Sequence, residues 1–429
     1  MSTKVFRLTD SQLFKRKALQ WAVLHDPCCY LDSHGYQDPH GRFDTWIGVG
    51  SLASWKGYSG QEAWKRLQEF LDAHPAHFLP GYLGYDLKNE IEDLQTRQPN
   101  RTGFADAAFF LPAVTIKINH QEVEIDSESP DAIFEAIETT LLQHPSINFT
   151  GTLQHRMSKS DYFTAFSRLQ DHIVRGDCYE INLCQEFYAE NAKLDPYAAY
   201  LHLKDVSPTP FSGYLRIGNH YVIGASPERF LSKKGTVLRS QPIKGTAPRW
   251  EDPLTDKAQA RQLQEDPKER SENIMIVDLV RNDLTKAALP GTVKTTELAE
   301  VYSFKHVHQL ISTIEAQADP EQNQTSILRH CFPPGSMTGA PKISAMIRIE
   351  EAESSRRNVY SGAFGYFAPG GDFDFNVVIR SLLYNEASGY VSFHTGGAIT
   401  AKAQAEAEYE ECLLKGKAIF GILSPTKSV

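Results

Sequence analysis

Strand and helix signals are grouped along this chain instead of alternating strictly, and this grouping constrains the fold more than any other feature. Two hairpins are expected in succession, from "SGYLRIGNHYVIGAS" with a Gly-Asn turn and from "RFLSKKGTVLRS" with a Lys-Gly turn. Helical signals then fill 252–289, and strand candidates follow at 359–367, 374–384 and 389–395. Because a doubly wound parallel sheet needs a helix after each strand, we expect antiparallel or mixed sheets with helices packed outside.

Helices are also predicted on both sides of a junction near residue 150. The segment 62–74 is amphipathic, and its apolar face consists of Trp64, Leu67, Phe70 and Leu71. A second helix is expected to begin near Ser160 and to end at Gly176. We therefore expect an N-terminal part, 1–150, followed by a second part, 151–425.

Charge and composition argue against several classes of protein. The net charge is −9 at pH 7, whereas a nucleic-acid-binding protein is normally basic. No run of about 18 apolar residues exists, and the first residues lack the apolar region of a secretion signal, so no membrane association is expected. Six cysteines without a CxxC pair are typical of a reduced, cytoplasmic protein and argue against a zinc site.

Two predicted helices have carboxylates at helical spacing. Glu269 and Glu272 lie three residues apart in "DPKERSENIMIVDLVRNDL". Glu408 and Glu411 repeat this spacing in "AQAEAEYEECLLKGKAIF", and Lys415 follows four residues after Glu411. One interpretation is a pair of solvated helix faces. The other is a Mg²⁺ site, in which carboxylates from two helices hold the ion and leave positions for water and an anionic substrate.

Lys244 lies in "QPIKGTAPR", which is predicted to be a rigid turn at the end of a sheet. Most lysines at such positions are solvated loop residues. The neighbouring residues must decide whether this lysine differs.

Nine segments of the second part resemble, in their order and spacing, the chorismate-utilising enzymes. They are "GDCYEINLCQ", "GASPERFL", "QPIKGTAPR", "DPKERSENIMIVDLVRNDL", "VYSFKHVHQLIST", "FPPGSMTGAPK", "YSGAFGYF", "DFNVVIRS" and "GGAIT". The N-terminal part resembles the same family more weakly, through "YLDSHGYQDPHGRFD" and "LPGYLGYDLKNEIEDL". The resemblance implies an α/β (α+β) fold, a large sandwich of two facing, mostly antiparallel sheets with helices outside.

Two details resemble the aminodeoxychorismate branch of this family. Anthranilate synthases typically have alanine at the position of Lys244, within a PIAGT-like turn, whereas aminodeoxychorismate synthases have lysine. The segment "YDLKNEIE" also resembles that branch. The implied activity is amination of chorismate at C4, which gives 4-amino-4-deoxychorismate for p-aminobenzoate and folate biosynthesis.

The resemblance implies covalent catalysis by Lys244. Its amine would attack C2 of chorismate as the C4 oxygen departs, and ammonia would then attack C4 and expel the lysine. A lysine must be neutral to attack, so we expect burial or nearby cations to lower its pKa. Glu228, in "SPER", matches the family's acid position and would protonate the leaving hydroxyl. The alternative for Glu228 is a strand-end carboxylate paired with Arg229.

The resemblance also implies how the two carboxylates of chorismate are bound. The ring carboxylate would bind Mg²⁺, and the ion would be held by Glu272, Glu408 and Glu411, with Glu269 in direct contact or one water away. The enolpyruvyl carboxylate would bind the planar fork of Arg380. Further substrate-binding candidates are Tyr366, the backbone amides of Gly396 and Gly397, Lys415, and His308, for which a buried core histidine is an equal alternative.

Two other functions stay open. Anthranilate synthase component I would aminate C2 and release pyruvate, but Lys244 would fill the space near C2. A non-catalytic relative that binds chorismate or tryptophan would need neither Lys244 nor Glu228.

Two residues depart from the family pattern. Glu180 replaces a common glutamine and Lys402 replaces a common aspartate, but neither is expected to touch a residue of the implied catalytic scheme.

No nucleophile elbow with a His/Glu pair for glutamine hydrolysis is found. Ammonia is therefore expected from solution or from a separate glutamine amidotransferase subunit.

Overall fold

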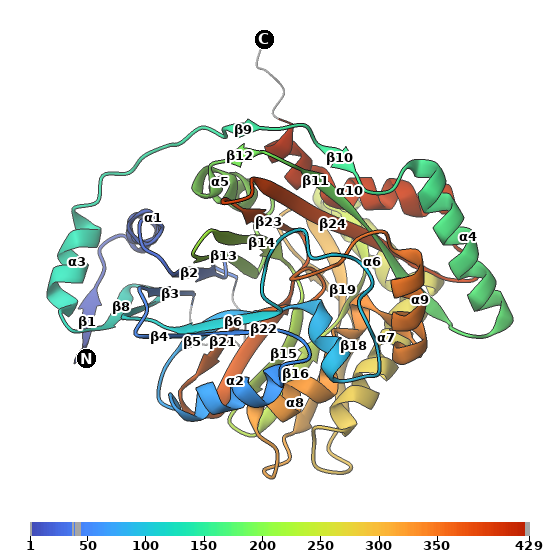
Figure 1. The fold of residues 1–429 in the computed structure, drawn as a ribbon, viewed down its shortest axis with the longest axis horizontal. Helices are drawn as coiled ribbons and strands as arrows, with labels where there is room; N and C mark the ends of the chain where they lie inside the picture. Colours follow the sequence, from blue (N-terminus) through green and yellow to red (C-terminus); the bar gives the residue numbers. More distant parts are fainter. Residues whose placement is uncertain (1, 37, 39–43, 425–429) are drawn as a thin grey trace.

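Two large antiparallel sheets form the centre of the computed structural model, which describes residues 2–36, 38 and 44–424 (Figure 1). The 12-stranded sheet has the order β1 (Ser2–Arg7), β8 (Glu122–Ser127), β7 (Val114–Asn119), β3 (Thr45–Val49), β2 (Cys28–Asp32), β13 (Phe211–Ile217), β14 (His220–Ser226), β23 (Ser381–Asn385), β24 (Tyr390–Ile399), β11 (Glu180–Ala189) and β10 (Gln154–His155), with β20 (Gly339–Ala340) beside β11. The 10-stranded sheet has the order β17 (Ile243–Pro248), β19 (Val307–Gln317), β16 (Val237–Gln241), β15 (Arg229–Lys234), β22 (Asp372–Val377), β21 (Ala363–Ala368), β5 (Leu79–Leu83), β6 (Ala107–Leu111) and β4 (Ala53–Gly57), with β18 (Lys294–Ser303) beside β19. A small separate pair joins β9 (Phe149–Thr150) to β12 (Lys193–Leu194).

The two sheets face each other across an apolar layer. Its buried side chains come from both sheets and include Cys29, Leu215 and Val222 of the first and Tyr82, Phe110 and Phe364 of the second. Burying each large apolar side chain stabilises the fold by about 1.5–3 kcal/mol. The expected sandwich of two facing antiparallel sheets is therefore confirmed.

Helices cover the outer faces of both sheets. Packed on the first sheet are α1 (Ser11–Ala22), α3 (Pro130–Glu138), α5 (Pro196–Val206) and α10 (Ala405–Leu423). The helices packed on the second sheet are α2 (Ala63–Asp72), α7 (Pro267–Thr285) and α8 (Gln324–Cys331). The helix α6 (Pro253–Glu265) lies near β17. The helices α4 (Lys159–Arg175) and α9 (Lys342–Ala352) pack beside β11.

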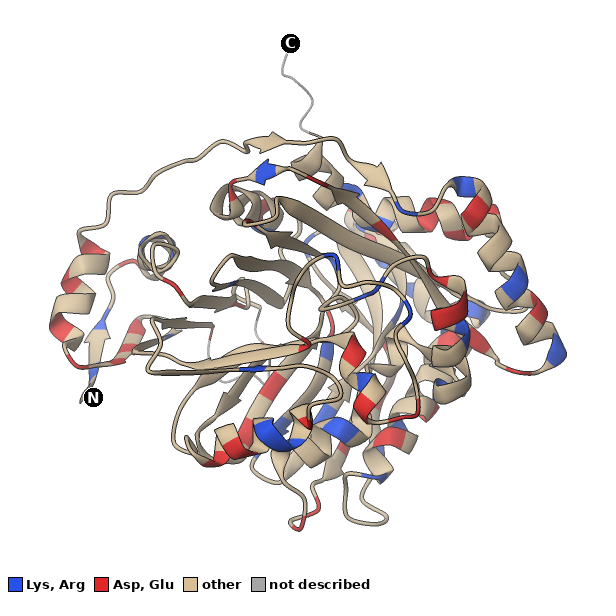
Figure 2. Ribbon diagram, viewed as in Figure 1, with Lys and Arg blue, Asp and Glu red and all other residues tan. Residues whose placement is uncertain are grey.

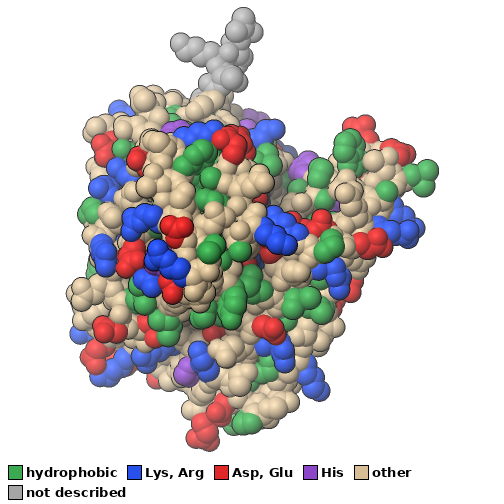
Figure 3. Space-filling model, turned by 90° about the vertical axis from the view of Figure 1, so that its right-hand side faces the viewer, with side chains coloured by type: hydrophobic (Ala, Val, Ile, Leu, Met, Phe, Trp, Pro, Cys, Tyr) green, Lys and Arg blue, Asp and Glu red, His purple; other side chains and the backbone are tan. Residues whose placement is uncertain are grey.

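Charged residues follow this layering. Figure 2 shows them concentrated on the outer helices, and Figure 3 shows both signs of charge interspersed over one face. In the described part of the chain, no helix is long and apolar enough to cross a bilayer.

Local signals placed several elements correctly. The helix expected at 62–74 is α2, and the helix expected from Ser160 to Gly176 is α4. Ser158 and Asp161 form a capping box that starts α4, and Gly176 ends it with a φ of 89°. Both predicted hairpins are present as β13–β14 and β15–β16.

The strand predicted at 374–384 is wrong in one respect that affects the site. It consists of two strands, because β22 ends at Val377 in the second sheet and β23 begins at Ser381 in the first. Arg380 lies at this crossing with a φ of 52°. The apolar run contains no glycine or proline, so the break has no local signal.

Residues on both sides of position 150 share the two sheets. The strands β1, β2, β3, β7 and β8 lie in the first sheet, and β4, β5 and β6 lie in the second. The boundary at 150 accordingly stays a prediction about sequence segments.

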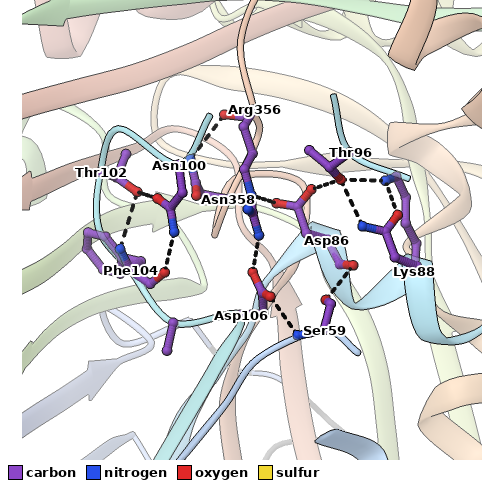
Figure 4. A network of polar contacts seen from close by, with 12 residues as sticks. Ser59, Asp86, Lys88, Thr96, Asn100, Thr102, Phe104, Asp106, Arg356 and Asn358 are labelled. Carbon is purple, nitrogen blue, oxygen red and sulfur yellow. Dashed lines mark hydrogen bonds and ion pairs between the residues drawn. The ribbon is translucent and has the colours of Figure 1, made fainter. Parts of the chain in front are cut away.

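The segment "YDLKNEIE" joins the N-terminal part to the second part (Figure 4). It forms the short helix η1 (Tyr85–Glu90), and Arg356 bridges Asp86, at 2.8 Å, and Asp106. The buried Lys88 forms an ion pair with Glu350 at 2.8 Å. These polar side chains therefore tie η1 to the segment that leads into β21.

Candidate active site

Lys244 lies in the edge strand β17, not in a turn. The strand pairs with β19, and its register shifts between Ile243 and Thr246, where Gly245 has a φ of 92°. Such an irregularity lets a side chain leave the regular ladder direction. The side chain of Lys244 is only 12% exposed, and it reaches β11 of the other sheet. The predicted turn was wrong because a Pro- and Gly-containing segment can also form a bulged edge strand.

Glu180 of β11 is the direct partner of Lys244. The Lys244 Nζ atom donates a hydrogen bond to Glu180 Oε1 at 2.7 Å, and Glu180 is 1% exposed. Burial by itself disfavours the ammonium form, but Glu180 and then Glu272 outweigh it and raise the pKa of Lys244. Two expectations are thus corrected: Glu180 does touch the predicted nucleophile, and the pKa of Lys244 is raised instead of lowered.

Glu228 lies immediately before β15 and is buried, with 4% exposure. Burial is the largest influence on its carboxyl group and raises its pKa to about 7. Its neighbour Arg229 pairs instead with Asp374, at 2.9 Å, and with Asp38. The alternative pair between Glu228 and Arg229 is therefore not formed, and Glu228 can be protonated at neutral pH.

Four segments distant in the sequence converge around Lys244. A Cβ atom on Gly245 would lie 3.0 Å from Glu269 Oε2, and one on Gly397 would lie 2.4 Å from Glu408 Oε2. The backbone of β17 thus lies close to Glu269 of α7, and that of β24 close to Glu408 of α10, and the φ of 92° at Gly245 favours glycine there.

Lys415 extends this convergence from α10 to the end of β24. It donates to the carbonyl of Gly396 at 2.8 Å and pairs with Glu411 at 2.7 Å. The backbone of both Gly396 and Gly397 belongs to the ladder between β24 and β11.

The carboxylates of α7 and α10 form a partly compensated acidic cluster. Burial raises the pKa of Glu269 and Glu408, and raises that of Glu272 to about 7. Burial acts in the same direction on Glu411, but the ammonium of Lys415 outweighs it and lowers the pKa. Oxygen donors with excess negative charge suit a hard cation such as Mg²⁺.

Among the residues that the structure describes, these carboxylates do not form a complete metal site by themselves. Among the described residues, no group of three or more His, Cys, Asp or Glu side chains is positioned to hold a metal ion. Mg²⁺ commonly uses one or two carboxylates together with water and substrate oxygens. The donor type therefore fits Mg²⁺, but the expected set of three direct ligands is not preformed.

Arg380 fits an anion site. It lies at the crossing between the sheets, and its guanidinium has no hydrogen bond or ion pair within the described ranges. Burial lowers the pKa of Arg380, while charge interactions with Tyr360 and Glu411 oppose this effect. A partly enclosed guanidinium without a partner is ready to bind a carboxylate by its planar fork.

Tyr366 is not brought to this cluster. It lies on β21, stacks on Trp46 with ring centroids 4.9 Å apart, and is separated from β17 by the four strands β22, β15, β16 and β19. Tyr360, in the same "YSGAFGYF" segment, is the tyrosine near Arg380, and its hydroxyl lies 3.6 Å from Cys184 Sγ. The choice between two tyrosines six residues apart required the strand start at Ala363.

His308 has protein partners on both ring nitrogens. Its Nε2 lies 3.0 Å from Asp256 Oδ1, its Nδ1 lies 2.8 Å from Ser303 Oγ, and the residue is 2% exposed. This environment favours the interpretation as a buried core histidine.

Several known proteins are similar to this chain in sequence. A family model described as chorismate binding enzyme matches residues 26–421. The chain is 36% identical over 416 residues to aminodeoxychorismate synthase component 1 from Escherichia coli, covering 90% of this chain and 91% of that protein. It is 34% identical over 353 residues to anthranilate synthase component 1 from Thermus thermophilus, covering 79% and 76%.

Solved structures show the same fold. Anthranilate synthase component I from Streptococcus pneumoniae superposes with a TM-score of 0.75 and 25% identity, covering 89% of this chain and 92% of that chain. The menaquinone-specific isochorismate synthase from Escherichia coli has a TM-score of 0.75 at 18% identity, covering 99% and 95%. Together with the family match over residues 26–421, these findings show that the chain belongs to the chorismate binding enzyme family and is a chorismate-utilising enzyme.

Proposed function

We propose that this enzyme aminates chorismate at C4 with ammonia and forms 4-amino-4-deoxychorismate. The observation that supports this most directly is Lys244, an enclosed amine beside a carboxyl group, Glu228, whose pKa is about 7. The similarity to aminodeoxychorismate synthase component 1 from Escherichia coli supports the same reaction.

The two side chains supply complementary chemistry. Lys244 gives up one proton, and its lone pair forms a bond to C2 while the ring double bond shifts and the C4–O bond breaks. Glu228 protonates the departing oxygen, which leaves as water. Ammonia then forms the C4–N bond, the double bond shifts back, and the C2–Nζ bond breaks with its electron pair returning to Lys244. The proton that Lys244 gives up passes to Glu228 once Glu228 has protonated the departing oxygen, and a proton from the incoming nitrogen returns Lys244 to its ammonium form.

Binding of the two substrate carboxylates uses separate groups. Arg380 would take the enolpyruvyl carboxylate through its unpaired guanidinium, with Tyr360 beside it. Glu272 and Glu411, with Glu269 and Glu408 nearby, would hold Mg²⁺, which neutralises the ring carboxylate and the acidic cluster.

The ammonia supply completes this proposal. The similar protein from Escherichia coli is named component 1, which implies a second subunit there. We propose that a separate glutamine amidotransferase subunit supplies ammonia to this chain and that ammonium salts can replace it in vitro.

One incubation tests the proposed function. The purified chain is mixed with chorismate, Mg²⁺ and an ammonium salt, and the product is identified by mass and chromatography. We expect 4-amino-4-deoxychorismate, which retains the enolpyruvyl group. Anthranilate with release of pyruvate would instead show anthranilate synthase activity, and no turnover with intact chorismate binding would show a non-catalytic relative.

A further inference from the structure

We propose that Glu180 forms the ammonium subsite of this active site, an inference that rests on the proposed function. The two oxygens of its buried carboxylate have different surroundings. Oε1 accepts the hydrogen bond from Lys244 at 2.7 Å, whereas Oε2 is buried and has no hydrogen-bond partner in the described part of the chain. Because a buried carboxylate oxygen without a donor is costly, this atom indicates a ligand that donates hydrogen bonds.

The backbone holds this carboxylate in a fixed place. Glu180 begins β11, which pairs with β24 on one side and with the short strand β20 on the other, where Glu180 is opposite Ala340. The approach is close, since a Cβ atom on Gly339 would lie 2.1 Å from the carbonyl oxygen of Glu180. A strand packed in this way positions a ligand more precisely than a surface loop does.

The reaction geometry places ammonia beside the same carboxylate. Lys244 bonds to C2, and ammonia attacks C4, which is separated from C2 by one ring atom. A carboxylate that touches the lysine nitrogen through one oxygen can therefore reach a nitrogen approaching C4 through the other. A glutamine at this position offers a single, uncharged acceptor, whereas Glu180 offers two oxygens and a full negative charge.

The surrounding charges also favour a small cation. The ionisable groups that act on Lys244 and its neighbours are Glu180 from β11, Glu228 before β15, Glu269 and Glu272 with Lys268 from α7, and Glu408 and Glu411 with Lys415 from α10. Mg²⁺ would neutralise the carboxylates of α7 and α10, but once Lys244 is bonded to C2, Glu180 loses the ammonium partner that it has in the structure. Ammonium, which is the main form of ammonia at neutral pH, fits this environment.

The proposed step balances as follows. Ammonium donates one proton to Glu180 Oε2, and the resulting ammonia uses its lone pair to form the C4–N bond. The ring double bond shifts back and the C2–Nζ bond breaks, with the electron pair going to Nζ. Glu180 then returns the proton to Nζ, which restores the ion pair seen in the structure.

Steady-state kinetics of Glu180→Gln test this role. A charge-assisted hydrogen bond contributes about 1.5–3 kcal/mol, so we expect the KM for ammonium to rise at least about 10-fold. Hydroxylamine is a neutral nucleophile near neutral pH, and its KM should change less than about 3-fold, like the KM for chorismate. A purely structural role of Glu180 would change the constants for both nucleophiles alike, and that result would overturn the inference.

Two further variants and one adduct measurement complete the test. Glu180→Asp keeps the charge and should regain part of the ammonium affinity, whereas the exposed Glu190→Gln on the loop after β11 should leave it unchanged. Trapping of chorismate on Lys244 without ammonia reports on the proposed function separately. An adduct in the wild type with an unchanged ammonium KM in Glu180→Gln would overturn the subsite alone, whereas a wild type without any adduct would overturn both.

Discussion

Glu228 is expected to lower the stability of the folded enzyme above neutral pH, and Glu228→Gln should remove this cost. Burial raises the pKa of Glu228 from 4.5 to about 7, a difference worth about 3 kcal/mol between the two protonation states. A carboxyl group with a higher pKa in the folded state binds its proton more tightly there, so the stability of the wild type falls as the pH rises from about 4.5 to about 7. Because the glutamine side chain has no titratable carboxyl proton, the Glu228→Gln variant lacks this dependence of stability on pH.

The difference between the two proteins can be measured by denaturant-induced unfolding. Between about pH 5.5 and about pH 8, the change in unfolding free energy on Glu228→Gln should shift in favour of the variant by about 2 kcal/mol. The same variant should lose amination, because the C4 hydroxyl has no proton donor. Stabilisation combined with lost activity would identify Glu228 as a residue retained for chemistry.

The exposed Glu190→Gln provides a control and should show no pH-dependent change of this size. If Glu228→Gln changed the unfolding free energy equally at both pH values, the carboxyl group would not be buried in its neutral form. If the variant retained wild-type amination, another group would supply the proton.

Three other predictions concern the same site. Lys244→Ala should abolish the chorismate adduct on the peptide 241–249, while chorismate still binds. The rate of C4 amination should fall by about 3–4 decades, which corresponds to roughly 4–5.5 kcal/mol of transition-state stabilisation. Amination at the wild-type rate by this variant, with no adduct in either protein, would contradict covalent catalysis. Turnover should fall to background when Mg²⁺ is chelated, and also in Glu272→Gln or Glu411→Gln, with the fold intact by circular dichroism. The exposed Glu410→Gln serves as the control and should keep its turnover. Full activity in excess chelator would exclude the proposed metal site. Glutamine alone should give no product with the isolated chain, and product formed without an added subunit would reveal an amidotransferase site within it.

Local sequence patterns predicted those elements whose start, end or turn is set by neighbouring residues. The helix α4 is fixed by a capping box at Ser158 and by Gly176 with its positive φ, and both signals are visible in the residues themselves. The β13–β14 hairpin likewise follows from alternation around a Gly-Asn turn. The segments around Lys244, Glu228, Glu272 and Glu411 were recognisable because each keeps its residue types at fixed spacing.

Positions set by contacts between distant strands were not predictable in this way. The sequence predicted Tyr366 at the substrate, but the start of β21 and the crossing at Arg380 place Tyr360, and not Tyr366, near Arg380. The crossing at Arg380 has no glycine or proline signal, and although Gly362 directly precedes β21, the placement of both segments depends on which sheet each short strand joins.

The sequence by itself determined the family, the grouping of strands and helices along the chain, and the residue types available for chemistry. Only the tertiary structure decided the protonation and pairing of those residues. Glu180 and Lys244 are 64 residues apart, and their 2.7 Å contact exists because β11 and β17 belong to different sheets that meet at the site. The pKa of Lys244 is set by this contact and by burial, and neither is encoded in a segment of neighbouring residues.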